Sequence, residues 1–148
     1  MNSEEILNLN PESASIQTHL SIIQNVIQRM ADNSSSCKAW CVTLVSAVLV
    51  IVADKGRPEY AWIALLPTFV FSALDAYYLA LEKGFRNSYN DFIYRLHSKT
   101  LRAMDLYSIT PKGCLAKLQF DSLKSFSIWG FYVSLIVLIA ITKTIAIK

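Results

Sequence analysis

Two long apolar runs, separated by a short polar turn, dominate the pattern of hydrophobic and polar positions along the chain. Residues 39–53 carry no charged side chain, and residues 60–81 carry a single one, Asp75. An α-helix rises about 1.5 Å per residue, so about 17 to 25 apolar residues cross the hydrocarbon core of a bilayer. The second run has this length, and the first reaches it once Cys37 and Lys38 are included. The pattern predicts a transmembrane helical hairpin over residues 37–82, with a buried hairpin in a soluble helical domain as the alternative.

The segments before and within this hairpin predict long helices. The turn contains Gly56 and Pro58, residue types expected where one helix ends and another begins. Before the hairpin, five apolar residues spaced 4-3-4-3 predict an arm helix with a coiled-coil-like seam: Ile16, Leu20, Ile23, Ile27 and Met30. The serines at 34–36 could form a joint, but no Gly or Pro intervenes before the turn, so we expect the arm helix to continue into the hairpin. Pro67 is expected to kink the second span.

The second half of the chain predicts two more helical regions and a third apolar run. Residues 85–106 read as an amphipathic helix that places Arg95, Lys99 and Arg102 on one face. Its apolar face is expected to contain Phe85, Tyr89, Phe92, Leu96 and Ala103. A short helix is expected after Thr110-Pro111. Residues 126–142 are uncharged and predict a third span, with a re-entrant or interface-lying helix as the open alternative.

Composition and charge favour an all-α membrane protein. At 148 residues there is room for one domain, and a content of 53% apolar and 17% charged residues fits a membrane base with a polar helical part. We divide it into a cytoplasmic arm helix (1–36), a transmembrane hairpin (37–82), cytoplasmic basic linker helices (83–124) and a third span (125–148). With three spans, ten of the 14 Lys and Arg residues lie on the side of the arm and the linker. The positive-inside rule therefore places both in the cytoplasm. The acidic start MNSEEILNLN predicts no cleavable signal peptide.

Asp75 is the ionisable residue within the second run. An antiparallel register centred near residues 56–57 places it opposite Lys38, and it shares a helical stripe with Glu82. An ionisable group at this depth is costly unless it is paired or hydrated. Two roles follow for these residues, together with Arg29 of the arm helix. They form an ion pair that locks the hairpin, or they form a polar ring at the mouth of a pore.

Basic residues interleave with aromatic ones after residue 83. This pattern suits a ligand that carries phosphates and stacking bases, and it suits equally well side chains that extend toward anionic lipid headgroups or are simply solvated. The candidate ligand-binding residues are Arg86, Tyr94, Arg95, His97, Lys99 and Arg102. The two histidines, His19 and His97, have no metal-ligand or nucleophile-base spacing, and no glycine-rich phosphate loop occurs. We therefore predict neither catalysis nor a metal or cofactor site.

One arrangement in the chain resembles a known class of proteins. The arm helix, the stretch Arg29-Met30-Ala31-Asp32-Asn33-Ser34, Lys38-Ala39-Trp40, the apolar hairpin and then DAYYLALEKGFR resemble small bacterial membrane effectors of antiphage systems. These include SLATT-type effectors encoded beside nucleotidyltransferases, the membrane accessory protein of type VI-B CRISPR loci and the membrane component of Hailong-type systems. The resemblance covers about residues 15–107, and the third apolar run departs from the two-span members.

The resemblance implies a function and partners. Such effectors form homo-oligomeric channels or membrane-disrupting assemblies in the bacterial inner membrane, controlled by a nucleotide or oligonucleotide signal from a partner enzyme such as a nucleotidyltransferase. For this chain, a three-span protomer is too thin to enclose a pore alone, and the seam of the arm helix offers a surface for assembly. The alternative function is a membrane scaffold or accessory subunit that recruits a soluble partner through its basic helix.

Overall fold

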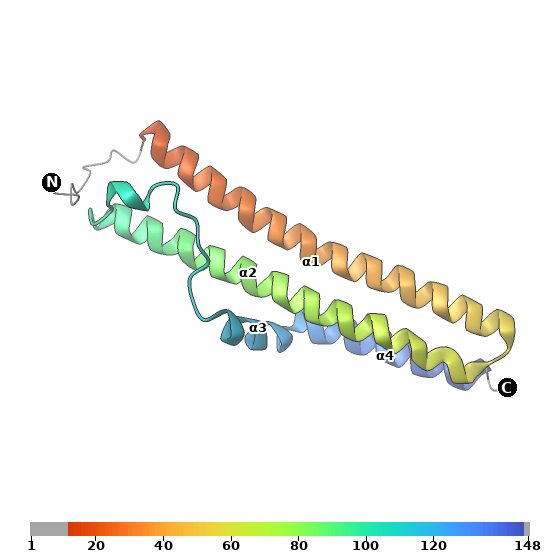
Figure 1. Cartoon of the computed structure of the whole chain (residues 1–148). Helices are drawn as coiled ribbons and strands as arrows, with labels where there is room; N and C mark the ends of the chain where they lie inside the picture. Colours follow the sequence, from red (N-terminus) through yellow and green to blue (C-terminus); the bar gives the residue numbers. More distant parts are fainter. Residues whose placement is uncertain (1–11, 147–148) are drawn as a thin grey trace.

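The computed structural model describes residues 12–146, and it is helical, with no β-strand within that range. Two long helices, α1 (Ala14–Lys55) and α2 (Leu65–His97), lie side by side along the molecule. Two further helices follow: α3 (Leu115–Leu123) packs against α2, and α4 (Phe126–Ala146) packs against η1, α2 and α1 (Figure 1). Residues 1–11 of the predicted arm and residues 147–148 of the predicted third span lie outside the described residues.

The arm helix continues into the first apolar run, as the absence of helix-breaking residues predicts. At 42 residues, α1 is about 63 Å long, roughly twice the thickness of a bilayer core. It ends where Gly56 adopts a left-handed conformation with φ +61°, and the N–H groups of Gly56 and Arg57 bond to the last carbonyls of the helix. The predicted hairpin turn therefore falls at residues 56–57.

The second span begins with a tighter helix. A 3-10 helix, η1 (Pro58–Ala64), leads directly into α2, and Pro67 is the third residue of α2. Proline is tolerated in the first turn because the N–H that it lacks has no partner within the helix there. Pro67 thus lies at the junction of the two helix types rather than in the middle of an α-helix.

The predicted amphipathic helix over residues 85–106 is wrong in its bounds. Residues 85–97 are the end of α2, which stops at His97, and Lys99 has a left-handed backbone with φ +56°. The chain then turns back, and residues 103–105 form a separate 3-10 helix, η2 (Ala103–Asp105). Lys99 and Arg102 are therefore not on a helical face with Arg95, and Ala103 is exposed rather than part of an apolar face.

Three helical segments are long and apolar enough to cross a membrane: α1, the continuous η1–α2 unit and α4. Fewer than a third of the residues in the apolar part of each are buried within the chain. Their outward surfaces carry large apolar side chains such as Trp40, Phe69 and Val137. A surface of this kind favours a surrounding lipid phase over water.

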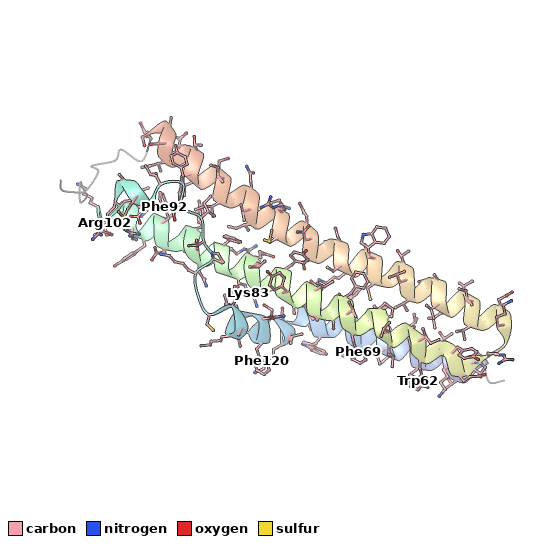
Figure 2. The ribbon with its side chains drawn as sticks, viewed as in Figure 1. Trp62, Phe69, Lys83, Phe92, Arg102 and Phe120 are labelled. Atoms are coloured by element: carbon pink, nitrogen blue, oxygen red, sulfur yellow. The ribbon has the colours of Figure 1, made fainter. Side chains whose placement is uncertain are left out.

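The buried apolar residues form two separate clusters. The membrane cluster lies between α1, η1, α2 and α4 and comprises Cys41, Val45, Leu49, Val52, Ala61, Ala64, Ala76, Ile128, Tyr132, Leu135 and Ile139. The distal cluster lies at the end of the molecule away from the hairpin turn and comprises Ile16, Phe92, Leu96 and Leu101. Figure 2 shows Phe92 at this distal end, far from Trp62 near the turn. We call the parts of the molecule around these clusters the membrane half and the distal half.

Candidate functional site

A buried ion pair lies between the two clusters. Lys38 Nζ of α1 is 2.6 Å from Asp75 Oδ2 of α2, the pairing that the antiparallel register predicts. The side chain of Asp75 is fully buried, whereas that of Lys38 retains 21% of its exposure. Ser34 donates its hydroxyl hydrogen bond to the other carboxylate oxygen, Asp75 Oδ1. Lys38 in turn donates to Ser34 Oγ at 3.4 Å, so the three side chains form one closed network.

The surroundings of the pair explain how a carboxylate is accommodated there. Ser34 and Lys38 are one turn apart on α1, so both side chains reach Asp75. The Tyr132 hydroxyl of α4 is also buried close enough to Asp75 to interact electrostatically with it, although it makes no hydrogen bond of normal length within the described residues. A charge at this position is stabilised by its partner and its hydrogen bond rather than by water.

The other residues assigned to a pore or ion-pair group lie elsewhere. Glu82 is buried on α2 and pairs with Arg86 one turn later at 2.8 Å. Arg29 is exposed on α1. The structure therefore joins Lys38 with Asp75 and Glu82 with Arg86, as two separate pairs.

Arg95 is held inside the distal half by Asp105. Its Nη1 donates to Asp105 Oδ1 at 3.0 Å, and its Nη2 forms a second bond to Oδ2. The backbone N–H of Arg102 also donates to Asp105 Oδ2, at 2.8 Å. Burial raises the pKa of Asp105, but these hydrogen bonds and the two guanidinium charges outweigh it, so the pKa lies below its ordinary value. Arg95 is thus already neutralised by a carboxylate.

The remaining candidate ligand residues are spread over the outer surface. Tyr94 is 73% exposed, and His97, Lys99 and Arg102 are exposed around the end of α2. Arg86 is exposed about three turns before the end of α2, closer to the membrane half. Figure 2 shows Arg102 at the distal tip of the molecule. These residues do not converge on one pocket.

A strap formed by residues 108–113 crosses α2. Lys112 N–H donates to the carbonyl of Gly84 at 3.0 Å, and Asn87 Nδ2 donates to the carbonyl of Lys112 at 3.3 Å. Ser88 Oγ bonds to the carbonyl of Thr110, and Lys112 Nζ pairs with Asp91. The strap lies so close that a Cβ added at Gly84 would be 2.8 Å from Pro111 Cβ.

His19 connects α1 to the loop of residues 98–114, which joins α2 to α3 and contains the strap. It is almost fully buried, stacks on Phe92 with ring centroids 4.3 Å apart, and its Nδ1 accepts a hydrogen bond from Tyr107 N–H at 2.8 Å. His19 lies about 20 residues before the apolar run 39–53. Burial lowers its pKa, and the charge of Asp105 opposes this only in part. His19 is therefore neutral, with its Nδ1 lone pair used by the loop.

A polar cavity of about 170 Å³ lies beneath the loop. Its lining includes His19, Asp91, Arg95, Asp105 and Lys112. The two cations and two carboxylates in this lining are already paired with one another. Within residues 12–146, no three His, Cys, Asp or Glu side chains lie close enough together to hold a metal ion.

Sequence reasoning gave no role to three residues of this region: Asp105, His19 and Gly84. His19 contacts Phe92 and Tyr107 from a distant part of the chain, which no local pattern identifies. Asp105 meets Arg95 because α2 ends at His97, where a longer helix was predicted. Gly84 could have been noticed, because a glycine inside a long helix lowers helix stability by about 1 kcal/mol relative to alanine. A glycine at such a position often reflects close packing against another segment. The pairing of Gly84 with the strap could not be predicted from its presence alone.

Comparisons with known proteins do not assign the chain to a family. No protein-family model matches it, and neither a curated protein nor a solved structure shows significant similarity.

Proposed function

We propose that this protein is a homo-oligomeric ion channel or membrane-disrupting effector of a bacterial antiphage defence system. In this proposal it lies in the inner membrane with its N-terminus and distal half in the cytoplasm, as the distribution of Lys and Arg favours. The three long apolar helices support a multi-pass membrane protein. The defence role and the control by a nucleotide or oligonucleotide from a partner enzyme rest on the sequence resemblance.

The observation that carries the channel proposal is a polar stripe along the outer face of α1. Its residues recur every three or four positions, all are exposed, and all but one are small or polar: Thr18, Ser21, Asn25, Gln28, Asp32, Ser35, Ala39, Thr43, Ser46, Val50 and Ala53. Most of the neighbouring exposed positions within the apolar run are large, as at Trp40, Leu44 and Ile51, and Ala47 is the exception. We call this face the α1 stripe.

The α1 stripe suits a neighbouring copy or a water-filled axis better than lipid. Small residues at this spacing allow transmembrane helices to approach closely, and hydroxyl groups can line a polar path. Thr43 Oγ1 bonds to the carbonyl of Ala39 at 2.9 Å, so its hydroxyl is satisfied while it faces outward. The space inside a single protomer is filled by the membrane cluster, so conduction requires several copies with their stripes facing a common axis.

The buried ion pair supports a locking role within each protomer. Asp75 is fully enclosed between α1 and α2, where it holds the hairpin in register. Control of the assembly is assigned to the distal half, where Arg86, Tyr94, His97 and Lys99 are exposed to a phosphate-bearing signal.

The test is conductance of the purified protein in a planar lipid bilayer, with and without candidate nucleotides or short oligonucleotides. Replacing Thr43 and Ser46 by Leu is expected to abolish unitary currents, because both branched side chains would occlude the axis. The matched control is Ser134→Leu on α4, which also replaces an exposed serine in an apolar span and is expected to leave the currents unchanged. Unchanged currents in the Thr43/Ser46 variant, or silence of the wild type at a verified oligomeric state, would reject the channel.

A scaffold is the second candidate function, favoured by a different observation. Three large side chains of the distal half, Tyr94, Met104 and Tyr107, are exposed outside the apolar spans. Exposed apolar and aromatic groups next to basic ones suit the surface of a soluble partner. A scaffold would be harmless when produced alone, whereas a deregulated channel would stop growth.

A further inference from the structure

A groove of about 590 Å³ lies beside the hairpin turn, away from the ion pair and the strap. Its apolar wall is formed by Val48, Ile51 and Val52 of α1 and by Ile63 of η1. Its end at the turn is polar and is formed by Lys55, Arg57 and Tyr60. The volume is in the range of small-molecule sites, about 300–1,000 Å³.

Aromatic and basic side chains near this groove indicate its level relative to the lipid headgroups of a membrane. Trp62 of η1 lies under Lys143 of α4, whose Nζ is 4.5 Å from the centre of the indole ring. Figure 2 shows Trp62 at the end of the molecule where the hairpin turns and the chain ends. Tryptophan, tyrosine and lysine gather at the level of lipid headgroups. The polar end of the groove is therefore at headgroup level, and its apolar wall extends into the acyl-chain layer.

The charges at the polar end are available to an anion. The lining contains two cations and no carboxylate. Lys55 approaches Asp54 only to 3.8 Å, and both side chains are more than 70% exposed, a geometry that stabilises little. Arg57 contacts Tyr60 rather than a carboxylate, with its Nη1 3.4 Å from the hydroxyl and its guanidinium 5.9 Å from the ring centre.

We propose that this groove binds an anionic glycerophospholipid. One acyl chain lies along Val48, Ile51 and Ile63, and the phosphate is held by Arg57 and Lys55. A guanidinium matches a phosphate through paired N–H donors, and a second cation selects a lipid with net negative charge over a zwitterionic one. A second copy of the chain is the less suitable occupant, because the α1 stripe proposed for assembly occupies a different face of α1. The lipid site does not depend on channel activity.

The experiment titrates delipidated full-length protein with phosphatidylglycerol or with phosphatidylcholine of identical acyl chains, and counts bound lipids by native mass spectrometry. The wild type is expected to prefer phosphatidylglycerol by roughly tenfold, the effect of one charge-assisted hydrogen bond. The variant Lys55→Gln/Arg57→Gln is expected to lose this preference. The matched control, Lys117→Gln/Lys124→Gln, removes two cations from the α3 region and is expected to keep it.

Two outcomes would overturn the proposal. One is a preference for phosphatidylglycerol that survives in the Lys55/Arg57 variant or is missing in the wild type. The other is efficient disulfide cross-linking between copies that carry Ile51→Cys in a background without native cysteines, which would show a second copy in the groove. Ile51→Trp provides an independent check that leaves both cations in place, because the indole would fill the groove and is expected to weaken binding of both lipids.

Discussion

In the membrane half, aliphatic and small side chains fill the space between the helices, whereas the distal half is a helix pair covered by a loop. Ala61, Ala64 and Ala76 are fully buried in the membrane cluster and bring η1 and α2 close to their neighbours. In the distal half, four apolar residues form the buried cluster, and polar contacts hold the loop in place. The first kind of packing depends little on pH and on electrostatic screening, whereas the second depends on both.

The difference indicates which part of the molecule can respond to a signal. The Arg95–Asp105 and Lys112–Asp91 pairs are partly exposed, so salt and competing ions can weaken them. The Lys38–Asp75 pair is enclosed and is screened far less. A ligand that engages Arg95 or Lys112 must displace a carboxylate, and doing so would remove one of the contacts that hold the loop on α2.

The largest expected effect concerns the buried Lys38–Asp75 ion pair, which lies between the two clusters. Asp75→Ala would leave Lys38 partly buried without its partner, and we expect a loss of about 3–5 kcal/mol of unfolding free energy. The measurement is reversible unfolding in bicelles. The double variant Lys38→Met/Asp75→Leu removes both charges and is expected to recover most of the loss. A change below about 1 kcal/mol for Asp75→Ala would show that the pair stabilises no more than an exposed one.

An intermediate effect is expected at the contact between α2 and the strap. Gly84→Ala would place a methyl group 2.8 Å from Pro111 Cβ and push the strap away. We expect a net loss of about 1–2 kcal/mol after the gain in helix propensity, which corresponds to about 5- to 30-fold faster exchange of the Lys112 amide proton. Adding Pro111→Gly to Gly84→Ala should restore protection to the level of Pro111→Gly alone. Unaltered exchange in Gly84→Ala would contradict the close contact.

The smallest expected effect is a pH dependence confined to the distal half. Because the pKa of His19 is lowered in the folded state, the unfolded chain takes up a proton first as the pH falls below about 6.5. Stability is full above this pH and falls below it, so opening of the loop should increase by at most about tenfold per pH unit. Asp105, whose pKa is also lowered, adds a loss only as the pH falls below its ordinary value of 3.8.

Hydrogen exchange between pH 7.5 and 5.5, corrected for intrinsic rates, measures this effect. The amide of Tyr107 should lose protection in the wild type, whereas amides of residues 41–52 should not. His19→Gln keeps an acceptor without the titration and should remove the pH dependence. Equal pH dependence in the variant would show that another group is responsible.

Much of the membrane half could be predicted from the sequence, because polarity and helix-breaking residues determine it locally. The uncharged runs predicted the apolar helices, and Gly56 predicted the position of the turn. The antiparallel register predicted the pairing of Lys38 with Asp75. The distal half was predicted less well. Lys99 and Arg102 continue the helical spacing of Arg95, but Lys99 adopts a left-handed backbone and the loop folds back, which buries Leu101. Contacts between distant segments decide that outcome, and no local period records them.

Because α1 is one unbroken helix, a movement at one of its ends is coupled to its other end. About half of the helix extends beyond the apolar run, and no glycine or proline provides a hinge between the two parts. A tilt of about ten degrees about Ser34 would move each end by roughly 5 Å, because each of the two parts is about 30 Å long. If α1 tilted as a rigid rod, a displacement of His19 by the loop would also shift Thr43 and Ser46, without a relay of side-chain rearrangements.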